Sequence, residues 1–156
     1  MAYSPSAVAN TILARSFSDN NLITPMKLQR LLYLVASEYA KESGATLLET
    51  GFQTWAYGPV DYLVHDKFRP FSRRAIDRYA RDAQGNALVI NTDEDPALRS
   101  ALDRVWRATR TLTAVELSDI VRVEGSAWDR AYQRDDDYLD DDEIRADTTY
   151  RAHLPL

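Results

Sequence analysis

Few side chains in this sequence are of the types that perform covalent or metal chemistry. The chain has no cysteine, and its two histidines, His65 and His153, stand far apart and outside any metal-ligand spacing. It also lacks the G-x-x-x-x-G-K-[ST] loop that cradles phosphates and the G-x-S-x-G turn that presents a nucleophilic serine. We therefore predict no catalytic residue, no metal site and no cofactor, and we expect that the protein is not an enzyme.

Aromatic side chains beside a turn are suited to binding another protein. Trp55 and Tyr57 precede the rigid dipeptide Gly58-Pro59. They could anchor an interface, because large aromatic side chains dominate the binding energy of protein contacts. The alternative is that both pack in the core, as most large aromatic residues of a small domain do.

Basic residues form two further candidate groups. Lys27 and Arg30 are three positions apart, so a helix places them on one face. They either contact carboxylates or phosphates of a partner, or belong to a solvated face with ion pairs near Glu38. The densest basic patch comprises Arg69, Arg73, Arg74 and Arg78. For this patch the alternative is again a solvated or ion-paired surface. Our candidates for contact with a protein partner are Lys27, Arg30, Trp55, Tyr57, Arg73 and Arg74.

The elements that position these residues are mostly helices. Thr24 and Pro25 form a cap-and-proline start for the strongest helix. Its apolar stripe comprises Leu28, Leu31, Leu32, Val35, Ala36 and Tyr39. Tyr33 and Leu34 are large residues off this stripe, so we expect a central helix that is covered on more than one side. Gly44 suits the left-handed residue that ends it.

The remaining segments predict shorter elements. Helices are expected to begin at the cap residues Ser4, Asp95, Thr113 and Ser126. A short helix is expected over residues 60–68, with Leu63, Val64 and Phe68 as its apolar side, packed on the core. Residues 52–57 and 87–90 are strand candidates that can pair as a small hairpin. Residues 133–143 carry seven acidic side chains and one arginine, a block typical of a solvated loop.

The predicted fold class is mainly α, a single helical domain around a long central helix with a small β-hairpin element. Residues 1–132 form the domain, and residues 133–156 form an acidic loop and tail that pack on it or extend from it. The chain has 156 residues, 45% of them hydrophobic, the size of one domain with a core.

Composition and charge limit the partners. No apolar run reaches the roughly 18 residues of a membrane span, and Met1–Pro5 lacks the pattern of a signal peptide. We therefore expect a cytoplasmic protein that does not bind membranes. Residues 81–156 carry seventeen acidic against ten basic side chains. This balance disfavours nucleic acid as a partner and suits a basic protein.

Two long segments carry a family signal. Residues 23–33, Ile-Thr-Pro-Met-Lys-Leu-Gln-Arg-Leu-Leu-Tyr, resemble the Thr-Pro-x-Lys-Leu-Gln-Lys-Leu-Leu-Tyr signature that opens a long helix in the Panacea domain. Residues 52–60, Phe-Gln-Thr-Trp-Ala-Tyr-Gly-Pro-Val, resemble the second signature of that family, Trp-x-Tyr-Gly-Pro-Val. Residues 117–128 resemble its Leu-Ser to Gly-x-x-Trp region. The order matches, and the resemblance covers residues 5–132.

The departures from the family pattern are local. Arg30 stands where the family commonly has lysine. Val121 and Arg122 stand where a Thr-His pair is common, so no role of that histidine is carried over. Residues 71–95 match no part of the family pattern.

The resemblance implies an antitoxin of a type II-like toxin–antitoxin system, a kind of pair often found on phages and other mobile elements. Its partner would be a cognate toxin that inhibits translation, such as a small alarmone-synthetase-like toxin, neutralised by direct binding. Two alternatives stay open: a proteolytic adaptor that delivers the toxin to a protease, and a DNA-binding autoregulator whose promoter binding depends on salt. The sequence leaves the identity of the toxin and the oligomeric state open.

Overall fold

Helices begin at the capping residues that the sequence supplies. The computed structural model describes residues 2–156, and in it the side chains of Ser4, Thr24, Asp95 and Ser126 each accept a hydrogen bond from a backbone amide of the first helical turn. Thr113 and Glu116 form a full capping box. These bonds satisfy amides that a helix leaves unpaired.

The described residues contain seven α-helices, three short 3-10 helices and two strands. The α-helices are α1 (Pro5–Ser18), α2 (Pro25–Ser43), α3 (Tyr62–Phe68), α4 (Pro96–Thr109), α5 (Ala114–Val121), α6 (Ala127–Gln133) and α7 (Asp141–Ala146). The 3-10 helices are η1 (Arg69–Phe71), η2 (Thr92–Glu94) and η3 (Thr149–Ala152). The strands are β1 (Gln53–Trp55) and β2 (Gly58–Val60).

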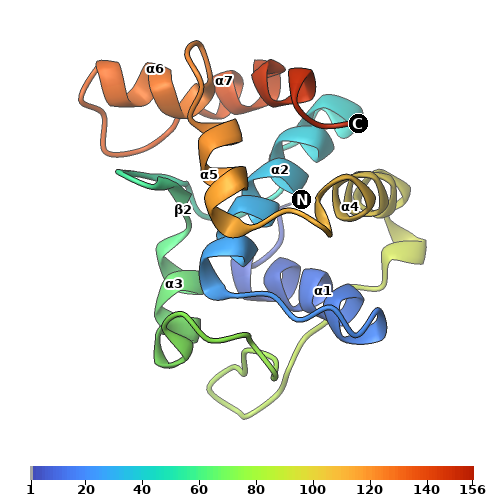
Figure 1. The fold of residues 1–156 in the computed structure, drawn as a ribbon. Helices are drawn as coiled ribbons and strands as arrows, with labels where there is room; N and C mark the ends of the chain where they lie inside the picture. The colour runs from blue at the N-terminus through green and yellow to red at the C-terminus, as the bar shows by residue number, and fades with distance from the viewer. Residues whose placement is uncertain (1) are drawn as a thin grey trace.

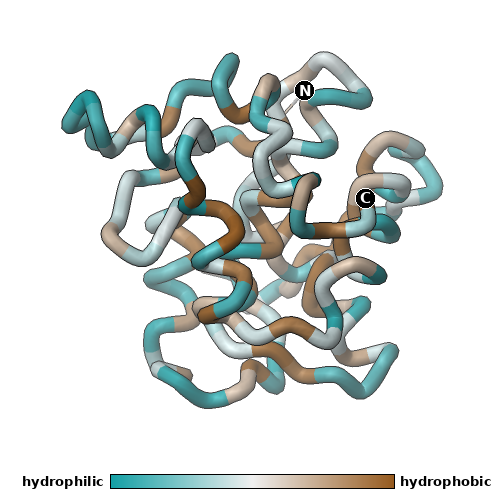
Figure 2. The backbone as a smooth tube through the Cα atoms, turned by 45° about the horizontal axis from the view of Figure 1, so that its top comes forward, coloured by the Kyte–Doolittle hydropathy of each residue, from teal (hydrophilic) through white to brown (hydrophobic). Residues whose placement is uncertain are grey.

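Helix α2 is the centre of the fold, with the other helices arranged around it (Figure 1). It packs against α1, α3, α4, α5 and α7. Tyr33 and Leu34, the two large residues off its main apolar stripe, are both 0% exposed, which confirms that the helix is covered on more than one side. Gly44 ends it with φ of 73°. Apolar segments gather in the interior and polar ones at the periphery (Figure 2). The predicted fold class is confirmed.

The β-hairpin forms from neighbouring segments. Strands β1 and β2 pair antiparallel, with Trp55 opposite Gly58, so the predicted pairing of residues 52–57 with residues 87–90 is wrong. Residues 87–90 instead run along α1 as irregular chain, because two polar side chains of α1 take up their backbone groups. Asn10 donates to the carbonyl of Leu88 (3.1 Å), and Thr11 accepts from the amide of Ile90 (2.9 Å).

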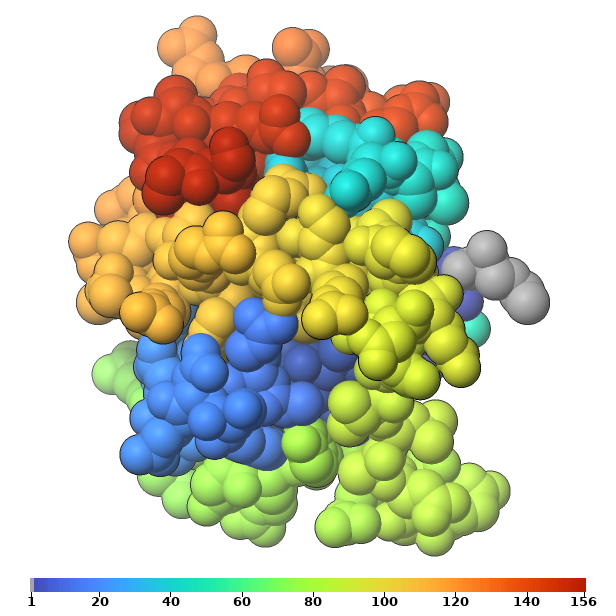
Figure 3. Space-filling model, turned by 90° about the vertical axis from the view of Figure 1, so that its right-hand side faces the viewer, coloured from blue at the N-terminus to red at the C-terminus, as the bar shows by residue number. Residues whose placement is uncertain are grey.

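The acidic run is only partly a loop. Asp135 to Asp137 and Asp140 to Asp142 are exposed, as predicted. The run ends in α7, however, because Asp140 caps that helix and the next three acidic residues fill its first turn, where the helix dipole favours negative charge. The chain then returns to the core, where Tyr150 is 0% exposed. The space-filling view shows this last segment lying against α4 (Figure 3).

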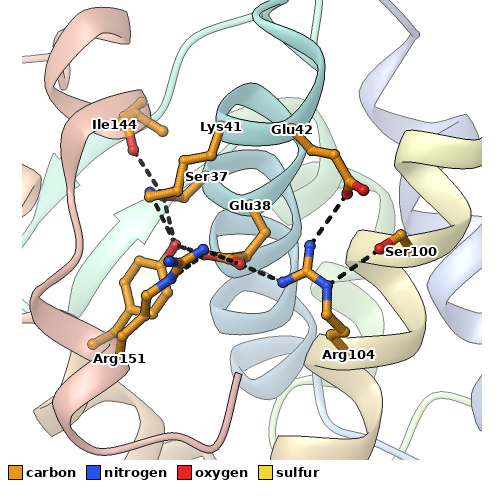
Figure 4. Close-up of polar contacts among 9 residues, drawn as sticks. Ser37, Glu38, Lys41, Glu42, Ser100, Arg104, Ile144 and Arg151 are labelled. Carbon is orange, nitrogen blue, oxygen red and sulfur yellow. Dashed lines mark hydrogen bonds and ion pairs between the residues drawn. The ribbon is translucent and has the colours of Figure 1, made fainter.

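A buried carboxylate on α2 links this helix to α4 and η3 (Figure 4). Glu38 is 0% exposed and accepts hydrogen bonds from Arg104 of α4 and from Tyr150 and Arg151 of η3. Burial acts to raise the pKa of Glu38, but the hydrogen bonds from Arg151, Tyr150 and Arg104 outweigh it and bring the pKa to about 2. A buried charge with this many donors is compensated.

None of the helices within residues 2–156 is both long and apolar enough to cross a membrane.

The Glu38 network predicts a dependence of stability on pH. The pKa of the folded carboxyl, about 2, lies below its ordinary value of 4.5, so the ionised group stabilises the fold above pH 4.5 and loses this effect as the pH falls toward 2. We expect Glu38→Gln to lower the free energy of unfolding by about 3 kcal/mol at neutral pH. In urea titrations, the difference between wild type and variant should shrink on acidification. A difference that stays constant down to about pH 3 would contradict a compensated charge at Glu38.

Candidate functional site

Two polar side chains in the first turns of α2 form hydrogen bonds with backbone groups of neighbouring segments. Lys27 Nζ donates to the carbonyl oxygens of Thr109 (2.9 Å) and Leu112 (2.6 Å), where α4 leads into α5. Gln29 exchanges two hydrogen bonds with the backbone of Asp61, the N-cap of α3, at 3.0 and 2.9 Å. Helix α2 therefore fixes the connection between α4 and α5 and the start of α3.

Arg30 holds the hairpin in the same way. Its guanidinium donates to the carbonyl oxygens of Tyr57 and Pro59, with 2.8 Å to Pro59. Gly58 lies directly against it with φ of +135°, and a Cβ at that position would stand 1.8 Å from Arg30 Nη1. The glycine is therefore required both by its backbone angle and by the space that the arginine occupies. Burial lowers the pKa of Arg30 to about 10, and the positive charge of Arg122 acts in the same direction.

Lys27 and Arg30 are thus interior residues. They are 7% and 1% exposed, so the expected solvated face is wrong, and so are ion pairs of Arg30 near Glu38, which binds Arg104 and Arg151 instead. The physical reason is that helix ends and turns leave carbonyl oxygens unpaired, and long cationic side chains supply several donors to them. Contact of Lys27 and Arg30 with a partner stays a prediction.

A groove lies beside Arg30, between the start of α2, the hairpin and α3. Its volume is about 240 Å³. Its apolar walls are Met26 and Leu28 from α2, Trp55 and Tyr57 from the hairpin, and Val64 and Phe68 from α3. Arg30 lines the groove, and so does Ser72, which follows η1. We call this site the aromatic groove.

The two hairpin aromatics differ in burial. Tyr57 is 64% exposed, so packing in the core is wrong for this residue. Trp55 is half-buried; its indole donates to Gln53 Oε1 (2.7 Å), and its ring meets the ring of His65 edge-on at 4.8 Å. The carbonyl of Trp55 accepts a hydrogen bond from Trp128 Nε1 (2.7 Å). Trp55 is therefore a fixed wall of the groove, and Tyr57 is available at its rim.

The arginine patch begins at the end of the groove marked by Ser72. Arg73 and Arg74 are both exposed. Arg74 donates to the carbonyl of Pro70 (2.8 Å) and lies over the ring of Phe71 at 5.8 Å. Within residues 2–156, neither arginine forms an ion pair with a carboxylate, so of the two expected surfaces the solvated one fits these residues and the ion-paired one does not. The structure thus brings Arg30, Trp55 and Tyr57 to one groove, with Arg73 and Arg74 next to it, while Lys27 reaches toward α4 and α5.

Sequence reasoning missed several residues of the site. Gln29 was not singled out, nor was Met26, and Val64 and Phe68 were taken only as core. Leu63 was expected on the buried side of α3 but is 51% exposed. The available signal was that Tyr62, Leu63 and Val64 are consecutive large apolar residues, which a single helix face cannot bury together.

The site offers contacts for a protein partner. No group of three or more His, Cys, Asp or Glu side chains in the described part of the chain is placed to hold a metal ion. His65 lies among aromatic rings, 4.8 Å from Trp55 and 5.9 Å from Tyr62 between ring centres. Aromatic walls, an exposed tyrosine and neighbouring arginines are the residue types that dominate protein interfaces.

Comparison with known proteins gives one family. A family model described as "Antitoxin SocA-like, Panacea domain" matches residues 28–129. Antitoxin SocA of Caulobacter vibrioides (strain NA1000 / CB15N) is 25% identical over 126 residues, which cover 79% of this chain and 67% of that protein. No solved structure matches the chain.

The contact between Gly58 and Arg30 predicts an unequal cost of two alanine substitutions. Gly58→Ala combines a strained backbone with a clash against Arg30, so we expect a loss of about 3 kcal/mol in the free energy of unfolding. Gly85→Ala is the matched control, because Gly85 has φ of +84° but open space around it, and it should cost about 1 kcal/mol. Urea denaturation compares the two. Equal losses would show that the guanidinium does not occupy the space beside Gly58.

Proposed function

Because this chain belongs to the SocA-like Panacea antitoxin family, we propose that it neutralises a cognate protein toxin by direct binding, as the antitoxin of a type II-like pair. The toxin is an inhibitor of translation, of which a small alarmone-synthetase-like enzyme is one example. The pair acts in the cytoplasm, where translation takes place. The chain itself contributes contact and not catalysis.

The aromatic groove is the observation that carries direct binding. It is bordered by an aromatic side chain that is 64% exposed, Tyr57, and by a second, Trp55, that the fold holds rigidly. A rigid aromatic wall loses little conformational entropy on binding. The exposed tyrosine side chain becomes buried when a partner binds, and this burial stabilises the complex. Arg73 and Arg74 add charge at the edge, where it guides association.

Direct binding and delivery to a protease make different predictions. The gene adjacent to this one would be expressed alone and together with this chain, and growth would be measured in cells with and without ATP-dependent proteases. We expect rescue in both strains, since neutralisation by contact needs no degradation. A cell-free translation mixture of purified components, inhibited by the toxin, should likewise recover when the chain is added. Rescue that requires the protease would replace direct inhibition with the adaptor function.

Tyr57→Ala tests the groove as the binding face. The side chain is exposed and makes no side-chain hydrogen bond within residues 2–156, so the substitution should leave the melting temperature unchanged. We expect it to weaken toxin binding by about 2 kcal/mol, roughly 30-fold, and to reduce growth rescue. The control is Leu88→Ala, an apolar side chain 56% exposed on the loop after Gly85. If both variants bind the toxin as the wild type does, the binding face lies elsewhere.

A further inference from the structure

The aromatic groove contains a buried positive charge that no carboxylate within residues 2–156 neutralises. Arg30 is 1% exposed, and the acceptors of its guanidinium are two backbone carbonyl oxygens. Its Nε is buried and has no acceptor. The charged group acting most strongly on it is another cation, Arg122. A buried charge without a countercharge is stabilised when a negative group is placed near it.

The edge of the groove is also basic. Arg73 and Arg74 are exposed and form no ion pair within the described residues. The acidic side chains of neighbouring segments are engaged elsewhere: Asp66 pairs with Arg69 at 3.1 Å, Asp77 pairs with Arg78 at 3.3 Å, and Asp61 caps α3. This face is therefore positive on a chain whose formal net charge is −5. Its charge complements an acidic partner surface.

The size of the groove suits a side chain of a partner protein. Its volume of about 240 Å³ is below the roughly 300–1,000 Å³ of pockets that enclose small organic ligands. Its rim is apolar, because Met26 and Tyr57, which both line the groove, are 38% and 64% exposed. An apolar hollow that continues into an apolar rim is the surface that receives an anchoring residue and its neighbours.

We propose that the aromatic groove binds an acidic, apolar segment of the toxin. One large apolar side chain enters between Met26, Tyr57 and Phe68, and carboxylates beside it in the segment face Arg73 and Arg74. The apolar side chain supplies affinity, and the carboxylates supply orientation, faster association and the countercharge that Arg30 lacks. This inference rests on the proposed antitoxin function, because it assigns the segment to the toxin.

Met26 provides a matched pair of variants. Met26→Glu and Met26→Lys place opposite charges of similar length at an exposed position that lines the groove. Glutamate in the first turn of α2 is favourable to the helix, so weaker binding by that variant does not reflect unfolding. A phage-displayed library of random peptides would be selected on the wild-type chain, and the enriched peptides would then be titrated against both variants.

We expect the enriched peptides to combine a large apolar residue with Asp or Glu. They should bind Met26→Glu about tenfold more weakly than the wild-type chain and Met26→Lys at least as tightly. Raising the salt concentration should weaken the binding of these peptides to the wild-type chain. A basic or neutral consensus, the absence of enrichment, or equal affinity for the two variants would overturn the inference.

Charge reversal at the edge of the groove is the second measurement. The double variant Arg73→Glu, Arg74→Glu should bind the same peptides about tenfold more weakly than the wild-type chain, or more weakly still. Arg99→Glu combined with Arg107→Glu, two exposed arginines on α4 across α2 from the hairpin (Figure 1), should change their affinity little. If the two double variants weaken peptide binding equally, only the net charge of the chain matters. That result would overturn the role of Arg73 and Arg74.

Growth rescue separates this inference from the antitoxin function. If the wild-type chain restores growth and Met26→Glu restores it equally well, the antitoxin function stands and the groove is not its contact. If the peptides behave as expected but the wild-type chain does not restore growth, the specificity of the groove stands and its assignment to a toxin falls.

Discussion

The arrangement of this molecule depends on hydrogen bonds from side chains of α2 to backbone groups of other segments. Lys27, Gln29 and Arg30 reach, in turn, the connection between α4 and α5, the start of α3 and the hairpin. Each bond meets two needs, because a buried cation or amide requires acceptors and turns leave carbonyl oxygens unpaired. The two antitoxin signatures are consequently halves of one structural unit. The arginine of the first occupies the space that the glycine of the second leaves free.

Much of the fold could be predicted from the sequence, because local chemistry determines it. Ser4, Thr24, Asp95, Thr113 and Ser126 cap helices as their types indicate. The two strand candidates were paired wrongly, because pairing depends on which segment offers free backbone groups, and side chains of α1 had taken those of residues 87–90. The start of α7 inside the acidic run was also missed, since a charge block conceals an aspartate cap.

The candidate site was predictable in composition and not in arrangement. Trp55 and Tyr57 were identified from their position beside Gly58-Pro59, but nothing local distinguishes the fixed tryptophan from the exposed tyrosine. Periodicity treats lysine and arginine as surface residues, so the burial of Lys27 and Arg30 required knowledge of the carbonyl oxygens that other segments bring to them. The likeness to the antitoxin family identified the right segments, and the structure gives the reason for their residue types.

The Glu38 network also has a consequence for the order of events during synthesis. Tyr150 and Arg151 follow Glu38 by 112 and 113 residues, and Asp147 follows its hydrogen-bond partner Tyr33 by 114. A ribosome therefore releases the whole of α2 long before Asp147, Tyr150 and Arg151 exist. Until then Glu38 has Arg104 but lacks the other two side chains that donate to it, and Tyr33 lacks the carboxylate of Asp147. The central helix, and with it the walls of the groove, acquires its final environment only when nearly the whole chain has emerged.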